Sequence, residues 1–157
     1  MKKALVFLLI VTLLLCSCAE KNNYADDVSV KAIAHKGIAA LTNKAEFITA
    51  EPGYLDDWFT TPDYVSDSVI YFATDANNHD QFGIYHVTEG NAKAMSALLR
   101  AYLDDCYENF NSLYNPEEMP KIRDAQVEIY GNYVVYAVFD EADRIALLSA
   151  IQNTLIS

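Results

Sequence analysis

The sequence predicts an α+β domain: a two-layer sandwich in which a four-stranded antiparallel sheet, made of two hairpins, carries helices on one face in the order α-ββ-α-ββ-α. Two observations predict it. Pairs of short segments with alternating apolar residues flank polar or glycine-containing turns, as the strands of hairpins do. Longer segments around these pairs repeat apolar residues at helical spacing. Because each helix has one apolar stripe, we expect the helices to cover one face of the sheet.

The first expected element is a helix over residues 27–45. Asp26 and Asp27 stand where helix caps and dipole-favoured acids belong. The apolar stripe that predicts the helix consists of Val30, Ile33, Ala34, Gly37, Ile38 and Leu41. From residue 47 to residue 67 this periodicity stops and turn-forming residues are frequent, so we expect a long loop there.

A hairpin and a long helix follow the loop. Strands are expected over residues 68–74 and 82–87, on either side of a polar turn at 75–80. The helix spans about residues 92–113. Its apolar face is formed by Met95, Leu99, Tyr102, Cys106, Phe110 and Leu113. Because Cys106 lies on this face, we expect it to be buried and unreactive.

The second half of the chain repeats this order. Strands over 126–130 and 133–139 are joined by Gly131-Asn132, a pair that suits a tight hairpin turn. A final helix begins at Asp140, and its apolar stripe consists of Ile145, Leu148, Ile151 and Leu155. The repeated order indicates either an internal duplication or the general likeness of any two ββα units.

The composition is that of a folded globular protein. The 157 residues are 52% hydrophobic and 21% charged, which suits one domain with a sizeable core and argues against disorder. The formal net charge of -11 at pH 7 makes the phosphate backbone of a nucleic acid an unfavourable partner. We therefore expect no nucleic-acid partner.

The N-terminus has the features of an export signal. A cationic start at residues 1–3 precedes an apolar stretch over 4–15, which is too short to span a membrane and suits a signal peptide. The sequence Leu15-Cys16-Ser17-Cys18 resembles the lipobox of bacterial lipoproteins. The resemblance implies diacylglyceryl transfer to the Cys18 thiol and cleavage between Ser17 and Cys18. The alternatives are a secretory signal with an incidental cysteine, or a short anchor.

This interpretation divides the chain into a signal peptide (1–17), a lipidated tether (18–27) and a single extracytoplasmic domain (28–157). We expect the protein on the extracytoplasmic face of the cell membrane, held in the bilayer by the acyl chains, such as palmitate, of the Cys18 lipid. Two acyl chains suffice for stable anchoring, whereas one is marginal. Processing leaves Cys106 as the one free thiol, so no internal disulfide can form.

Short motifs in the domain resemble an uncharacterised family of small lipoproteins of Firmicutes, a domain of unknown function. These motifs are Phe82-Gly83-Ile84-Tyr85, Tyr114-Asn115-Pro116-Glu117-Glu118 with Lys121, and Gly131-Asn132-Tyr133-Val134. The resemblance covers about residues 30–156 and implies a lipid-anchored, extracytoplasmic α+β domain. It implies no known activity, so it transfers no catalytic residue to this chain.

Motifs of catalysis and metal binding do not occur in the sequence. The three histidines, His35, His79 and His86, lack metal-ligand spacing, and the turn at 75–80 lacks the glycine and glutamate of a calcium loop. Nucleophile motifs and phosphate-binding glycine loops are missing as well. Paired acids could serve glycoside hydrolysis, but in so acidic a chain we expect them to be solvated. We therefore expect no metal, no cofactor and no catalytic residue.

Aromatic residues mixed with acids in the 47–67 loop provide a binding hypothesis. Such loops occur where proteins meet sugars, cationic peptides or other proteins. The candidate site comprises Tyr54, Asp56, Asp57, Trp58, Phe59 and Asp63. The alternative is that Trp58 and Phe59 close one end of the core. The expected function is that of a membrane-anchored, non-catalytic binding module for a protein, peptide or wall glycan. A cell-wall-acting hydrolase is the alternative.

Overall fold

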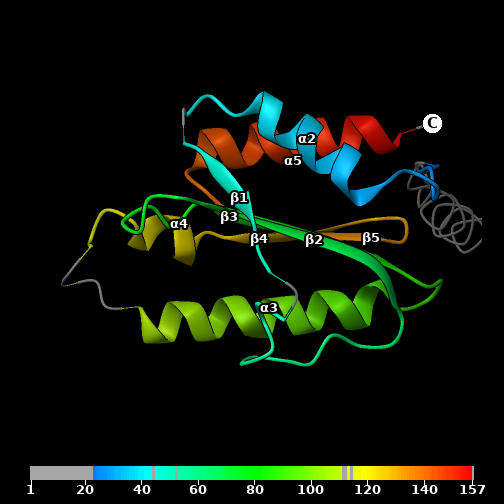
Figure 1. The fold of residues 1–157 in the computed structure, drawn as a ribbon, viewed down its shortest axis with the longest axis horizontal. Helices are drawn as coiled ribbons and strands as arrows, with labels where there is room; N and C mark the ends of the chain where they lie inside the picture. The colour runs from blue at the N-terminus through cyan, green and yellow to red at the C-terminus, as the bar shows by residue number, and fades with distance from the viewer. Residues whose placement is uncertain (1–22, 44, 52, 111–112, 114, 157) are drawn as a thin grey trace, which may run out of the picture.

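A five-stranded antiparallel sheet lies at the centre of the structure (Figure 1). The structure is a computed structural model that describes residues 23–43, 45–51, 53–110, 113 and 115–156. The elements in chain order are α2 (Val30–Ala40), β1 (Phe47–Thr49), β2 (Val65–Ala73), β3 (Gln81–Val87), α3 (Ala92–Asn109), α4 (Met119–Arg123), β4 (Gln126–Tyr130), β5 (Tyr133–Val138) and α5 (Glu141–Leu155). The predicted lipobox lies outside the described residues.

The two expected hairpins are present, but the sheet has a fifth strand. The strand order is β1-β2-β3-β5-β4, with every neighbouring pair antiparallel. β1 lies inside the segment expected to be a loop, where Phe47 pairs with Ala73 of β2 and packs against the core. The prediction of four strands is wrong because a strand of three residues is too short to show an alternating pattern.

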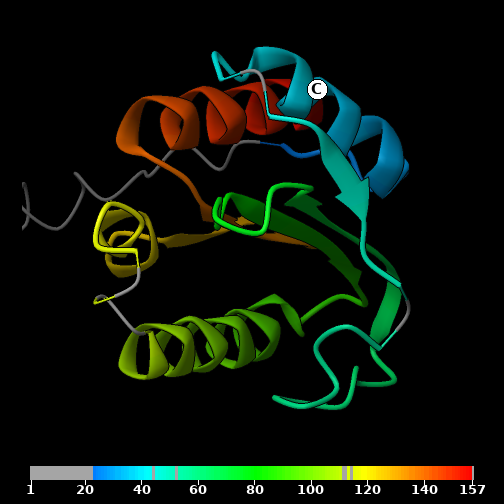
Figure 2. The same ribbon diagram turned by 60° about the vertical axis from the view of Figure 1, so that its left-hand side comes forward.

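Helices cover both faces of the sheet, so the expected two-layer sandwich is wrong. α2 and α5 lie on one face, and α3 lies on the other with α4 beside its end (Figures 1 and 2). The central strands bury side chains in both directions: Ile84 of β3 packs under α2 and α5, whereas Tyr85 packs under α3. A strand that is buried on both faces needs apolar residues at every position.

Two apolar cores result from this arrangement. The core on the side of α2 and α5 includes Ile33, Phe82, Val135, Phe139, Leu147 and Ile151. The core on the side of α3 includes Tyr85, Met95, Leu99, Tyr102, Val134 and Tyr136. Each fully buried side chain of this size stabilises the fold by roughly 1.5–3 kcal/mol relative to exposure.

The start of α2, the end of α3 and the buried face of α5 differ from the prediction. α2 begins at Val30 with Ser29 as its N-cap, and the carboxylate of Asp26, which was predicted to cap the helix, lies 2.9 Å from Nε2 of His86 instead. α3 ends at Asn109, and Leu113 beyond it is 91% exposed. In α5, Ile145 is exposed, whereas Leu147 is buried. The buried face of α5 is shifted toward Leu147, because Leu147 packs closely against Gly37 of α2. A Cβ atom built on Gly37 would lie 3.3 Å from Cγ of Leu147.

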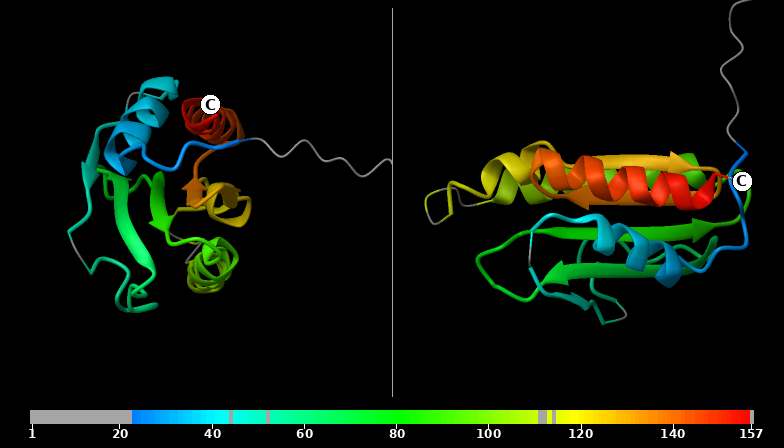
Figure 3. Two further views of the ribbon diagram at one scale, coloured as in Figure 1. Left: turned by 90° about the vertical axis from the view of Figure 1, so that its right-hand side faces the viewer. Right: turned by 90° about the horizontal axis from the view of Figure 1, so that it is seen from above.

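The turn between β4 and β5 follows the prediction. Two residues join the strands, Gly131 has a φ of 62°, and Tyr130 pairs with Tyr133 across the turn. Tyr24 packs against this turn, and the backbone N–H of Ala25 donates to the carbonyl of Leu155 at 2.8 Å. The first described residues therefore lie beside the end of α5, at the end of the sheet opposite the β2–β3 turn (Figure 3). In the described part of the chain, no helix combines the length and the hydropathy needed to cross a membrane.

Candidate ligand-binding site

The segment predicted to bind a partner folds as a chain of turns against α3. Leu55 is buried in the core on the α3 side and anchors the segment. The N–H of Phe59 donates to the carbonyl of Leu55 at 3.0 Å, and Gly53 has a φ of 84°, a conformation that favours glycine. These turns present the side chain of Trp58 outward while its backbone stays close to the core.

Trp58 is held in a defined orientation although 43% of it is exposed. Its indole Nε1–H donates to Oδ2 of Asp105 on α3 at 2.7 Å. Its ring meets the ring of Tyr102 edge-on, with centroids 5.1 Å apart and an interplanar angle of 78°. Trp58 is therefore not a core plug, whereas Phe59 is half-buried and packs against the core.

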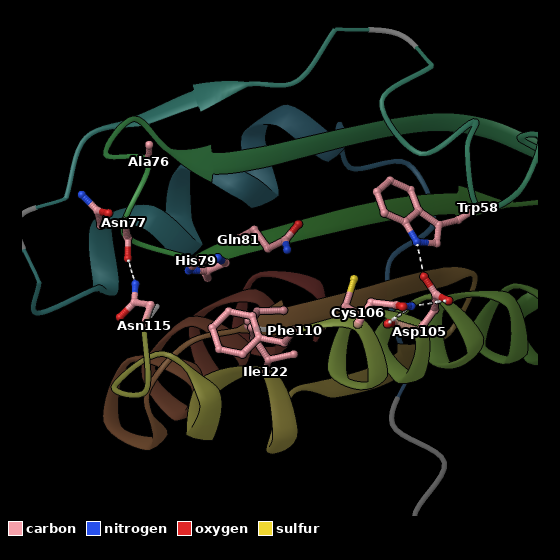
Figure 4. Close-up of a pocket in the computed structure, with 12 residues that line it drawn as sticks. Trp58, Ala76, Asn77, His79, Gln81, Asp105, Cys106, Phe110, Asn115 and Ile122 are labelled. Atoms are coloured by element: carbon pink, nitrogen blue, oxygen red, sulfur yellow. Dashed lines mark hydrogen bonds between the residues drawn. The ribbon is translucent and has the colours of Figure 1, made fainter. Parts of the chain in front are cut away.

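A cavity of about 430 Å³ opens beside Trp58, between α3, α4 and the β2–β3 turn (Figure 4). Its apolar wall is formed by Phe110, Ile122 and Val138. The rest of its lining includes four residues with side-chain amides: Asn77, Gln81, Asn109 and Asn115. This volume lies within the range of small-molecule sites, roughly 300–1,000 Å³.

A second cavity, of about 360 Å³, lies against another part of the same tryptophan. It is lined by the predicted residues Asp57 and Phe59 together with Leu98 and Tyr102. Trp58 and Asp105 line both cavities, so this pair forms the boundary between them. We refer to the cavity with the four amides as the amide cavity and to the second as the Asp57 cavity.

The amide of Gln81 is oriented by two tyrosines. Its Oε1 accepts hydrogen bonds from the hydroxyls of Tyr102 at 3.0 Å and Tyr136 at 3.3 Å. With its oxygen occupied in this way, the amide N–H₂ group is left as a donor in the wall of the amide cavity (Figure 4). Burial raises the pKa of both tyrosine hydroxyls, so they remain protonated donors at neutral pH.

A paired charge cluster supports the far side of the amide cavity. Nζ of Lys121 lies 2.8 Å from Oδ1 of the buried Asp80 and 2.9 Å from Oε1 of Glu118. Burial lowers the pKa of Lys121, but hydrogen bonds to these two carboxylates outweigh it and the net pKa lies above the ordinary value. The backbone N–H of His79 donates to Glu118 at 2.8 Å. The cluster therefore joins α4 to the β2–β3 turn as a structural support.

The thiol of Cys106 lies in the wall of the amide cavity (Figure 4). The residue is half-buried, so the prediction of a buried cysteine is correct only in part. Burial raises its pKa, which keeps the sulfur protonated and a weak nucleophile at neutral pH. Among the described residues, no three His, Cys, Asp or Glu side chains are grouped as metal ligands.

The other predicted site residues are dispersed. Tyr54 stacks on Phe72, with ring centroids 5.2 Å apart, and lines a third cavity of about 420 Å³ instead of the two at Trp58. Asp56 and Asp63 are exposed and line neither of the two cavities at Trp58. Sequence reasoning missed Asp105 and Gln81. The spacing of Tyr102 and Asp105 on one helix face was a usable signal, but nothing in the sequence placed Trp58 beside them.

The comparisons with known proteins identify a family but no function. The profile of a domain of unknown function, DUF4358, matches residues 60–139, which include β2 to β5 and the residues Gln81, Tyr102 and Asp105. Trp58 lies two residues before the matched segment. No curated protein and no solved structure matches the chain.

Proposed function

The chain belongs to the DUF4358 family of domains of unknown function, and we propose that it is a lipid-anchored, extracytoplasmic binding module without catalytic activity. Its ligand site is the pair of cavities at Trp58. The observation that carries the proposal is an exposed indole that is fixed by Asp105 between two cavities. Large aromatic side chains that are held in place and reach solvent are typical of binding sites.

The ionisable groups near the cavities favour binding over catalysis. Both oxygens of Asp105 accept hydrogen bonds, one from Trp58 and one from Asn109 at 3.0 Å. Lys121 is neutralised by two carboxylates, and Cys106 is a protonated thiol. A general base or a nucleophile needs a free, suitably ionised group near the reacting atom, and Asp105, Lys121 and Cys106 do not meet this need.

The anchor rests on the lipobox at Leu15-Cys16-Ser17-Cys18. The position of residues 24–26 agrees with it, because they lie beside the end of α5, whereas the amide cavity lies toward the β2–β3 turn at the opposite end. An attachment at that end would hold the amide cavity away from the bilayer. The acidic body of the protein would also be repelled by an anionic membrane surface.

Cell fractionation tests the anchor. In a bacterial host that processes lipoproteins, we expect the wild-type chain in the membrane fraction at its mature mass. Cys18→Ala should stall processing, because no other residue of the lipobox can take the lipid at that site. Cys16→Ala is the matched control and should behave as wild type. A Cys18→Ala protein that still sediments with membranes at the mature mass would contradict the anchor.

A further inference from the structure

The amide cavity carries one carboxylate, Asp105, and the Asp57 cavity carries two, Asp57 and Asp105, in a chain whose formal net charge is -11. In the described part of the chain, neither lining contains a lysine or an arginine. The carboxylate they share, Asp105, already accepts two hydrogen bonds. In the amide cavity, an ionic ligand would lose its hydration without gaining a free partner of opposite charge. The amide cavity therefore favours an uncharged ligand.

The polar groups of the amide cavity match hydroxyl groups. A side-chain amide both donates and accepts hydrogen bonds, as a hydroxyl does, and four residues with such amides line this cavity. Three of them already donate within the fold: Asn77 to Asp75, Asn109 to Asp105, and Asn115 to the backbone carbonyl of Asn77. Gln81 contributes a donor whose orientation is fixed by Tyr102 and Tyr136. Nδ1 of His79 is buried 3.7 Å from Oε2 of Glu118, and the His79 ring packs against Phe110 in the wall of the same cavity. A ligand that is rich in hydroxyls would satisfy several of these groups at once.

Trp58 and Phe110 supply apolar faces within the same site. The face of an aromatic ring carries partial negative charge and attracts groups with partial positive charge. The C–H groups on one face of a sugar ring have this character, while the hydroxyls around its rim remain free for hydrogen bonds. Trp58 is held at its Nε1 edge by Asp105, so the ring keeps one orientation for such contact.

We propose that the ligand is a neutral oligosaccharide strand that crosses Trp58 and places sugar units in both the amide cavity and the Asp57 cavity. The inference rests on the proposed binding function and specifies its ligand class. Two cavities that share one indole favour a linear ligand over a single small molecule, because one strand can contact the indole and continue to either side.

Fluorescence titration of the full chain in detergent micelles tests the strand. The chain has a single tryptophan, so its emission reports on Trp58 alone. The probes are β-1,4-linked N-acetylglucosamine oligomers, from the monosaccharide to the longest soluble chain. We expect a saturable change in emission and an affinity that rises about tenfold or more with chain length before it levels. An affinity that is the same for all lengths would overturn the strand crossing Trp58.

Variants of Gln81 test the ligand class by calorimetry. Gln81→Glu keeps the shape and still accepts from both tyrosine hydroxyls, but it replaces the cavity donor by a charged oxygen. We expect it to lose about tenfold or more in affinity for the longest oligomer while retaining its thermal stability. Gln126→Glu makes the same change of charge on the exposed side of β4 and should bind as wild type. Equal affinities for the two variants would contradict the role of Gln81.

The failure of the ligand class can be distinguished from the failure of the binding function. If no neutral oligomer binds and a lysine-rich peptide changes the emission of Trp58 instead, the oligosaccharide is refuted and the binding module stands. If Trp58→Ala and Trp58→Phe bind the longest oligomer as tightly as wild type, the indole is not part of the site and the proposed strand is refuted. The anchor is decided separately by the Cys18 experiment.

Discussion

Gly83 lies opposite Tyr136 in the central strand pair β3–β5, and the structure leaves no room for a side chain there. A Cβ at this position would lie 2.4 Å from Cε1 of Tyr136 and 3.2 Å from Cγ1 of Ile70. Tyr136 is fully buried, and its hydroxyl donates to Gln81. The ring cannot turn away without losing that hydrogen bond and its packing, so Gly83→Ala should strain the middle of the sheet.

The magnitude follows from the overlap. Non-bonded carbon atoms prefer a separation of about 3.5–4.0 Å, so the new methyl group would approach the ring by more than about 1 Å too closely. Overpacking in a core costs about 1–3 kcal/mol and occasionally more. We expect Gly83→Ala to lower the free energy of unfolding by about 3 kcal/mol and the Tm by roughly 10 °C.

Urea unfolding followed by circular dichroism measures this loss. Gly90→Ala is the control, because a Cβ at Gly90 would have no atom within 4 Å. Its only cost is the strain of an alanine at a φ of 87°, which lowers the free energy of unfolding by roughly 1–2 kcal/mol. In a Tyr136→Leu background, Gly83→Ala should cost less than it does in the wild type. The reasoning would be refuted if Gly83→Ala were no more destabilising than Gly90→Ala, or if its cost were the same in both backgrounds.

Three further predictions concern single residues. Asp143 is buried and accepts hydrogen bonds from Thr42 N and Oγ1, each at 2.7 Å; burial raises its pKa, but the bonds outweigh it and the net pKa is lowered. A lowered pKa means that the stabilising contribution of Asp143 is complete above its unfolded pKa of about 4 and is lost as the pH falls. Asp143→Asn should therefore lower the free energy of unfolding by about 2–3 kcal/mol at pH 7. The variant should also show a weaker dependence of urea unfolding on acid pH. Cys106 should react slowly with a thiol reagent in the native state and quickly in denaturant, because burial raises its pKa; rapid native labelling would contradict the raised pKa. Gly131→Val should lower the free energy of unfolding by about 2 kcal/mol in thermal denaturation, since a β-branched residue resists a φ of 62°, and a cost no greater than that of an exposed surface change would contradict the turn.

The hairpins could be predicted from the sequence because their signals are local. Gly131-Asn132 lies between two short apolar segments, and the structure confirms a two-residue turn there. The second helical layer was not predicted, although Tyr133–Val138 is six buried residues in a row. Such a run indicates a strand that is covered on both faces. Helix stripes alone indicate that the helices cover the sheet, but not whether they cover one face or both.

The candidate site depends on contacts between distant parts of the chain. Trp58 and Asp105 are 47 positions apart, and their hydrogen bond joins a segment without periodicity to the middle of a helix. A mixture of aromatic and acidic residues identified Trp58 as a candidate but gave no information on its neighbours. The orientation of Gln81 likewise requires two tyrosines from different elements, which only the packed fold brings together.

The strand order also determines how the protein would behave at high local density. One edge of the sheet is β4, which carries Glu128. The other is β1, which has only three residues, together with the first part of β2 that β1 leaves unpaired, where Asp67 lies at a register irregularity. Arg100 of α3 donates to the backbone carbonyl of Val127 in β4 at 2.9 Å. Edge strands that are short, that carry charged side chains, or whose backbone groups are already bonded by a side chain resist pairing with the strands of another molecule. Copies of this domain concentrated on one surface would therefore stay separate and not assemble edge to edge into a continuous sheet.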